Sequence, residues 1–277
     1  MHLLDILLLP LFGFIVAVPS SMVGLGGGFI IVPILICIFH LPPQNAVAVS
    51  LVAISGTTIS ATIAYMRQGR VDYMLGLLYD ILDIPGVVIG AYLTTFMPSD
   101  LLTGIVGFFI ASLSIVLMLR RESTPLSTRR EVANVGGKAW KRRKTDSSGR
   151  SFEYVVRRPD LALFSSLLGG IVTGLAGLGG GIIDTATMIL LGVPPHIAVA
   201  SSEFAMALTN GIGVIAHGLL NNVLVDYALL LTIGTIVGAQ SGSLLAKRVE
   251  GGFLKKLICL IAFFVGLRLI LLALTGL

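Results

Sequence analysis

Two identical glycine runs are the strongest candidates for contact with a ligand. The sequence GLGGG occurs at residues 24–28 and again at residues 177–181, both times inside a long apolar stretch. Consecutive glycines allow positive φ angles, and a helix that begins after them has free N–H groups and a partial positive charge at its start. The pattern therefore predicts contact with a small anion. The candidate contacts are Gly26, Gly27, Gly28, Gly179, Gly180 and Gly181. The alternative is that glycine only permits tight helix packing.

Two carboxyl groups follow the second glycine run. Asp184 comes three residues after the run, and Glu203 lies in the next apolar segment. An ionised carboxylate at this place would repel an anion, whereas removal from water favours the neutral acid. We therefore predict that Asp184 or Glu203 takes up a proton as the anion binds, which would couple the two fluxes. The same groups could instead make structural hydrogen bonds or coordinate Na⁺.

Hydroxyl and amide side chains in the apolar segments are further candidates, because their donors suit the oxygens of a small oxyanion. The main ones are Ser50, Ser201, Ser202 and Asn210, and the secondary ones are Thr57, Thr58 and Thr209. Ser50 and Ser202 carry more weight because they are equivalent in the internal repeat described below. Each group could instead bond to the backbone of its own helix.

Four ionisable residues at other places have more than one interpretation. His217 could relay protons, although a place at the membrane interface is the simpler reading. Arg268 could neutralise an anion on its path, reach toward the membrane surface, or pair with an acid. Asp80 and Asp83 come just before Pro85 and indicate a kinked, hydrated stretch of helix.

No motif of an enzyme or of a cofactor site accompanies these residues. The sequence has no HExxH, and no Gly-Lys-Ser/Thr follows the glycine runs as it does in a Walker loop. Cys37 and Cys259 lie in apolar segments without metal-ligand spacing, so we interpret them as small buried hydrophobes. Asp72 and Asp226 each precede an apolar segment and are predicted to cap its helix. We expect no catalytic residue, metal or cofactor.

The composition indicates a membrane protein. Of the 277 residues, 55% are hydrophobic and 12% are charged, and the mean hydropathy is +0.97. Apolar runs of about 18 residues or more recur along the chain, as in helices that cross a bilayer. They are continuous rather than alternating, which excludes a β-barrel. The N-terminal stretch has neither a basic start nor a small-residue cleavage motif, so we expect it to be part of the structure.

The chain contains an internal repeat. Pro42-Pro43 corresponds to Pro194-Pro195, AVAVS at 46–50 to AVASS at 198–202, and VDY at 71–73 to VDY at 225–227. We predict a first membrane repeat at 1–119 and a second at 161–277, each with five apolar segments. The expected segments are 3–22, 27–39, 44–65, 73–96 and 101–119, then 161–176, 179–191, 195–217, 226–246 and 253–276.

A basic connector separates the two repeats. Residues 120–160 hold 12 of the 19 Lys and Arg and 5 of the 14 Asp and Glu. Positive residues favour the cytoplasmic side of a membrane, so we predict a cytoplasmic connector that contacts anionic lipid rather than nucleic acid. Arg67, Arg70 and the basic cluster at 247–256 then fall on the same side. Five membrane elements are an odd number, so the two repeats insert with opposite orientation.

The segments at 27–39 and 179–191 are too short to cross a bilayer. They would reach only ~20 Å, against a hydrocarbon core of ~30 Å. We therefore predict that each repeat contains a hairpin that enters the membrane, turns at the glycines and returns. Non-helical backbone at this depth must be buried in protein or line a cavity. The expected fold is an all-α polytopic membrane protein of two inverted repeats, each with one glycine-broken hairpin.

Both halves resemble one known family. VGLGGGFIIVPILICIFHLPPQNAVAVS and GLAGLGGGIIDTATMILLGVPPHIAVASS are similar to the duplicated signature of the TauE/SafE sulfite exporter family. The resemblance implies transport of sulfite, of sulfonates such as sulfoacetate, or of related small anions. Asp184 and Glu203 depart from the symmetry of the repeat, because their counterparts are Ile31 and Leu51.

These observations together predict a secondary transporter of the cell membrane. It would move a small anion, sulfite or an organosulfonate, by alternating access between its two halves. The alternatives are a passive anion channel and a carrier for a different small anion. The expected partners are the anion and the lipid bilayer, without nucleic acid, and the sequence does not determine the oligomeric state.

Overall fold

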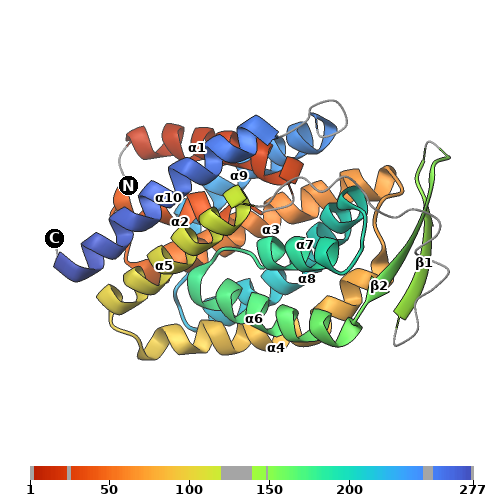
Figure 1. Cartoon of the computed structure of the whole chain (residues 1–277). Coiled ribbons are helices and arrows are strands. Elements are labelled where there is room, and N and C mark those ends of the chain that lie inside the picture. The colour runs from red at the N-terminus through yellow and green to blue at the C-terminus, as the bar shows by residue number, and fades with distance from the viewer. Residues whose placement is uncertain (1–2, 24–25, 120–138, 148, 246–251, 276–277) are drawn as a thin grey trace.

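The structure is a computed structural model of the whole chain, and it describes residues 3–23, 26–119, 139–147, 149–245 and 252–275 (Figure 1). The first half contains α1 (Leu3–Val23), α2 (Gly28–Cys37), α3 (Pro43–Arg67), α4 (Tyr73–Leu93), the 3-10 turn η1 (Thr94–Phe96) and α5 (Ser99–Leu119). The second contains α6 (Pro159–Ala176), α7 (Gly181–Leu190), α8 (Pro195–Leu219), α9 (Val225–Leu245) and α10 (Gly252–Thr275). The strands β1 (Ala139–Thr145) and β2 (Ser151–Arg157) lie between the halves.

The two halves repeat the same helix pattern, as the sequence predicts. The helices α2 and α7 have 10 residues each, and α3 and α8 have 25 each. Both long helices begin at the second proline of a Pro-Pro pair, where a missing N–H costs no helical hydrogen bond. Because the local signals recur in the same order, the same elements form twice.

The helices also pack in repeat-equivalent pairs. In Figure 1, α1 lies along α9 at the top and α4 along α6 at the bottom, with α3 and α8 between them. Glycine allows these close approaches, because a Cβ at Gly234 would lie 1.9 Å from the carbonyl oxygen of Pro10. On the opposite side, a Cβ at Gly174 would lie 2.1 Å from the carbonyl oxygen of Val87. The opposite membrane orientation of the halves stays a prediction.

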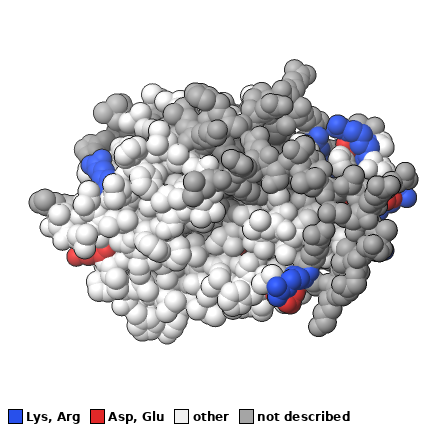
Figure 2. All heavy atoms as spheres, in the orientation of Figure 1, with Lys and Arg blue, Asp and Glu red and all other residues white. Residues whose placement is uncertain are grey.

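The distribution of polar residues is that of a multi-pass membrane protein. Among the described residues, five helices are long and apolar enough to cross a membrane: α3, α4 with η1, α5, α8 and α9. Large apolar side chains such as Leu7, Phe108 and Phe164 are exposed, while Asp83, Asp184 and other polar residues are buried. Figure 2 shows a largely uncharged middle, with the coloured Lys, Arg, Asp and Glu toward the ends of the visible face. Residues 247–251 of the basic cluster lie outside the described residues.

A β-hairpin that the sequence analysis did not predict forms part of the connector. The strands β1 and β2 pair antiparallel, with Ala139 opposite Arg157 and Thr145 opposite Ser151. Tyr154 and Val156 are buried in a cluster with residues of α4, α7 and α8. The hairpin therefore packs against the membrane helices, whereas residues 120–138 of the connector lie outside the described residues.

Candidate functional site

The chain leaves helical geometry at both glycine runs, as predicted. We call residues 26–28 the first glycine segment and residues 177–181 the second, and residues 24–25 lie outside the described residues. Gly26 and Gly27 have φ angles of 70° and 97°, and Gly177 and Gly179 both have 66°. Such angles favour glycine because it has no Cβ. Each segment leads directly into a short helix, α2 or α7.

The two glycine segments are in contact inside the protein. A Cβ at Gly28 would lie 2.2 Å from the carbonyl oxygen of Gly177. The Ser50 hydroxyl of α3 donates a hydrogen bond to that same carbonyl at 2.9 Å, and the equivalent Ser202 of α8 donates to the Gly181 carbonyl at 3.4 Å. The structure therefore brings together the glycines and the two repeat-equivalent serines.

Two apolar side chains that the sequence analysis missed cover the glycine segments. The Ile54 Cγ2 atom lies 3.0 Å from the Cβ position of Gly26 and 3.2 Å from that of Gly179. The Met206 Sδ atom lies 3.4 Å from the Cβ position of Gly26. Ile54 and Met206 are equivalent in the repeat, which is the sequence signal that could have identified them. In the observed conformation, apolar groups therefore pack against the backbone predicted to contact the anion.

Asn210 is the predicted polar residue best placed beside the second glycine segment. Its side chain is fully buried, and neither amide atom has a hydrogen-bond partner among the described residues. The Nδ2 atom lies 3.6 Å from the Cβ position of Gly179. Buried polar groups are rarely left without a partner, so Asn210 has a donor and an acceptor available for a ligand.

Three predicted hydroxyl groups have structural partners instead. Thr57 donates to the Ala53 carbonyl of its own helix at 3.2 Å, and Thr58 donates to the Ser55 carbonyl at 3.2 Å. Ser201 accepts the backbone N–H of Asp72 at 2.9 Å and so holds the start of α4. The contacts of Thr57 and Thr58 match the alternative of bonding to their own helix, whereas Ser201 contacts the backbone at the start of a different helix.

The predicted carboxyl groups lie in different surroundings. Asp184 and Glu203 are both fully buried, and none of their four oxygens has a hydrogen-bond partner among the described residues. Asp184 interacts electrostatically with Asp80 and Asp83 of α4, whereas Glu203 interacts with Tyr65 of α3. The sequence treats Asp80 and Asp83 as marks of a hydrated helix, but the structure joins them to the surroundings of Asp184.

The two other secondary candidates lie at different depths. His217 is buried in the protein, and its ring is held between the Gly174 carbonyl at 2.8 Å from Nε2 and the Asn222 amide at 3.3 Å from Nδ1. This pairing suits a neutral ring that donates from Nε2 and accepts at Nδ1. Arg268 is exposed on the outside of α10, near Cys37 of α2.

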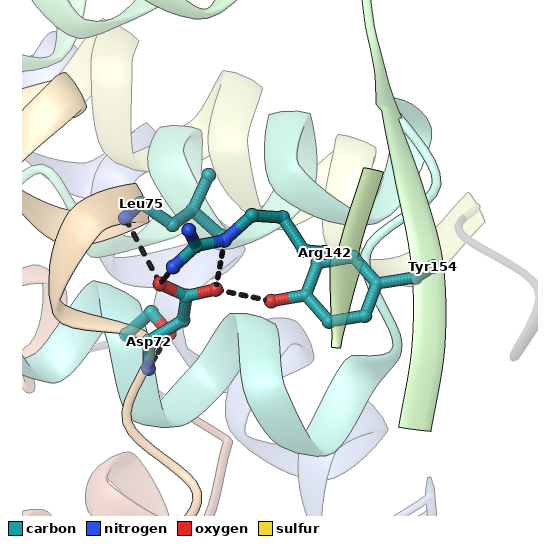
Figure 3. Close-up of polar contacts among 5 residues, drawn as sticks. Asp72, Leu75, Arg142 and Tyr154 are labelled. Carbon is teal, nitrogen blue, oxygen red and sulfur yellow. Dashed lines mark hydrogen bonds and ion pairs between the residues drawn. The ribbon is translucent and has the colours of Figure 1, made fainter. Parts of the chain in front are cut away.

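Asp72 connects the β-hairpin to the membrane helices (Figure 3). Its carboxylate accepts the Leu75 N–H at 3.3 Å, which confirms the predicted helix cap, and it also accepts the Arg142 Nε–H at 2.9 Å. The second nitrogen of the Arg142 guanidinium and the Tyr154 hydroxyl donate to the same carboxylate. Asp72 therefore both caps α4 and holds the β-hairpin against that helix.

The charges of this contact support one another. Burial by itself raises the pKa of the Asp72 carboxyl, but hydrogen bonds from Arg142 and Tyr154 and the charge of Arg142 outweigh burial, so the net pKa lies below its ordinary value. The hydrogen bonds to Asp72 raise the pKa of Arg142. Burial, followed by the hydrogen bond to Asp72, raises the pKa of Tyr154. The pair is ionised near neutral pH and ties the connector to α4.

The apolar helices and the buried polar groups define a multi-pass membrane protein, and the comparisons with known proteins place it among membrane transporters. The family described as "Sulfite exporter TauE/SafE" matches residues 9–269. The chain belongs to this family.

Individual relatives agree with this assignment. The chain is 30% identical to the probable membrane transporter protein YunE of Bacillus subtilis (strain 168), over 96% of this chain and 98% of that protein. It is 25% identical to the probable membrane transporter protein YdhB of the same organism, over 93% and 97% of the two chains. A shorter match, 37% identical over 30% of this chain and 17% of the other, is to sulfite exporter TauE/SafE family protein 3 of Arabidopsis thaliana. No solved structure matches this chain at a significant level.

Proposed function

We propose that this membrane transporter carries a small anion, sulfite or an organosulfonate, across the cytoplasmic membrane by alternating access. The observation that carries the proposal is the contact between the two glycine segments in the protein interior, where Gly28 meets the Gly177 carbonyl. Two segments that are far apart in sequence, each followed by the start of a short helix, converge at one place. The name of the family supports the choice of anion.

The anion would bind where α2 and α7 begin. The first N–H groups of a helix have no partner within that helix, and their partial positive charge attracts anions. Asn210 would add a neutral donor beside the second glycine segment. Neutral donors and helix ends bind an anion reversibly, as a carrier requires, because they do not hold it with a full opposite charge.

Binding and release of the anion would require a change in the packing of Ile54 and Met206. Both side chains lie against the glycine segments in the observed conformation, so the anion must displace them. Because the two residues come from equivalent long helices, α3 and α8, a rocking movement of the halves would shift them together. We propose that the connector at 120–160 lies in the cytoplasm and that the halves are inverted relative to each other.

Uptake into proteoliposomes tests this function. The purified protein would be reconstituted and supplied with radiolabelled sulfite or sulfoacetate, with and without unlabelled anion inside. A carrier shows saturable uptake that internal anion accelerates, whereas a passive channel shows no such acceleration. Absence of uptake of every small anion tested would refute the proposal, and uptake of only another anion would refute the substrate.

A matched pair of alanine variants connects the activity to the site. In Gly28→Ala the new Cβ would lie 2.2 Å from the Gly177 carbonyl, whereas a Cβ at Gly211 of α8 would meet nothing within 4 Å. Loss of uptake in Gly28→Ala together with normal uptake in Gly211→Ala is the expected result. Equal uptake by both variants would contradict a role for the glycine contact.

A further inference from the structure

A threonine hydroxyl joins two buried carboxyl groups between α4 and α8. The Thr209 Oγ1 atom lies 2.9 Å from Asp80 Oδ1 and 3.0 Å from Asp83 Oδ2. Asp80 and Asp83 are three residues apart and so share one face of α4. Asp80 is 4% exposed, and Asp83 and Thr209 are 0% exposed. We call Asp80 and Asp83 the acidic pair.

The hydrogen count at Thr209 requires a proton on the acidic pair. A hydroxyl group has one hydrogen and can donate it to only one acceptor. If both acids were ionised, one of the two short contacts would place oxygen lone pairs against each other. If one acid is protonated, it donates to Thr209, and Thr209 donates to the other acid, so that both contacts become hydrogen bonds. The hydrogen bonds can run from Asp80 through Thr209 to Asp83 or in the reverse direction, so the two acids can share the proton.

The surroundings of the acidic pair contain no positive charge among the described residues that face it. Gly169 and Gly170 of α6 lie against Asp83, and Asp184 of α7 interacts electrostatically with Asp83 and Asp80. Tyr79 of α4, which is neutral near pH 7, is close to Asp184. Ionised carboxylates here would have no cation to balance their negative charge, and a proton is the simplest species that can balance it.

The acidic pair is linked to the proposed anion site by two short paths. Asp184 Oδ1 and Asp83 Oδ1 lie 3.3 Å and 3.4 Å from the same point, the Cβ position of Gly169. Asp184 belongs to the first turn of α7, and its N–H donates to the Gly180 carbonyl at 3.0 Å. On α8, Thr209 is followed directly by Asn210, which lies beside Gly179. Asp184 itself is fully buried, and neither of its oxygens has a hydrogen-bond partner among the described residues. Both oxygens are therefore available to take up a proton from the acidic pair.

We propose that Asp80, Thr209 and Asp83 form the proton-binding site of the transporter and exchange their proton through Asp184. The inference rests on the proposed anion transport and names the residues of its coupling. Protonation of this cluster removes negative charge next to the second glycine segment, so proton binding and anion binding favour each other. The balance is simple, because one proton binds to or leaves a carboxylate oxygen and no other bond changes.

Proton binding can be measured without transport. Infrared difference spectra of the purified protein, recorded as the pH is changed, detect protonated carboxyl groups by their C=O stretch. We expect a buried carboxyl band in the wild type that is altered in Asp80→Asn and in Asp83→Asn and shifted in Thr209→Val, where a hydrogen-bond partner is lost. A band unchanged in all three variants would overturn the assignment.

Coupling of sulfite transport to protons is measured in proteoliposomes with radiolabelled sulfite. Two quantities are compared: the accumulation of sulfite driven by a pH gradient, and the exchange of sulfite when the pH is equal on both sides. With one proton per anion, a gradient of about one pH unit supports up to about tenfold accumulation. We expect this accumulation in the wild type and its loss, relative to exchange, in Thr209→Val, with recovery in Thr209→Ser. The matched control is Thr232→Val, which removes a hydroxyl that donates to the Ala228 carbonyl of its own helix at 2.6 Å.

The outcomes separate the two proposals. If the wild type exchanges sulfite but Thr209→Val keeps full pH-driven accumulation, the proposed proton site is wrong and anion transport stands. The same conclusion follows if a sodium gradient alone drives sulfite accumulation in the wild type. If the wild type transports no sulfite or sulfonate, the proposed function fails. The infrared band would then still decide whether the acidic pair binds a proton.

Discussion

The contact of Arg142 with Asp72 allows a quantitative prediction about the connector. The Asp72 side chain is 1% exposed and the Arg142 side chain 28% exposed. Removing one partner of a buried ion pair typically costs about 3–5 kcal/mol, because a buried charge is left uncompensated. Water reaches Arg142, and Tyr154 and the Leu75 N–H still donate to Asp72, so we expect Arg142→Met to weaken docking of the β-hairpin by about 2–3 kcal/mol.

Hydrogen exchange of the hairpin measures this loss. Amides of β1 and β2 exchange when the hairpin opens, and in the usual regime their rate follows the population of the open form. A loss of about 2–3 kcal/mol corresponds to exchange about 30- to 140-fold faster, since about 1.4 kcal/mol is a factor of ten. Mass spectrometry of peptides that cover residues 139–157 would show this acceleration, with no comparable change in α3 or α8.

A double-mutant cycle and a surface control test the reasoning. Asp72→Asn removes the charge and keeps one oxygen, which can accept the Leu75 N–H of the cap, while the amide NH2 takes the place of the oxygen that accepts from Tyr154 and can donate to that hydroxyl instead. The double variant with Arg142→Met should therefore lose less than the sum of the single losses. Arg143 is 69% exposed and lies 3.8 Å from the exposed Glu153, so Arg143→Met should change exchange by less than a factor of about three. Equal effects of Arg142→Met and Arg143→Met would refute the argument that burial gives the Asp72 contact its strength.

Three further predictions follow from the described contacts. The pKa of Asp72 is lowered in the folded protein. The stability that Asp72 contributes is therefore fully present above its unfolded pKa of about 4 and is lost as the pH falls through the lower folded pKa. Over that fall in pH, hydrogen exchange of the hairpin, corrected for intrinsic rates, should accelerate in the wild type and much less in Asp72→Asn. Gly28→Ala, with a Cβ 2.2 Å from a carbonyl of the other glycine segment, should reduce anion uptake at least about tenfold, and normal uptake would contradict it, with Gly211→Ala as the control. Asp184→Asn should alter the pH dependence of uptake more than Glu203→Gln, because only Asp184 adjoins the acidic pair, and the reverse order in pH profiles would move the coupling site to Glu203.

Much of the fold could be predicted from the sequence, because its signals are local. Proline pairs mark the starts of α3 and α8, and the glycine runs interrupt the chain where the structure has positive φ angles. Five apolar segments per half agree with the ten α-helices of the described residues to within a few residues at most boundaries. The β-hairpin was missed because the dense basic residues of β1 indicate a solvated connector, whereas the burial of Tyr154 and Val156 of β2 depends on tertiary packing against the helices.

The candidate site could be predicted only in part. Repeat equivalence singled out Ser50 and Ser202, and in the structure both bond to the second glycine segment. It did not reveal that Thr57 bonds to its own helix while its counterpart Thr209 bonds to two acids, because a sequence does not show which neighbour a helix face meets. Asp80 and Asp83 looked like features of one kinked helix for the same reason.

The sequence by itself determined the membrane class, the two repeats and the breaks within them, because hydropathy, proline and glycine act over a few residues. Only the tertiary structure decided that the glycine segments touch, that Ile54 lies between them and that Thr209 joins two carboxyl groups. Except for the contact of Ile54 with Gly26, these contacts connect residues more than a hundred positions apart. The polar contact of Thr209 with the two acids forms because the close packing of α4 and α8 removes water from groups that must then find partners in one another.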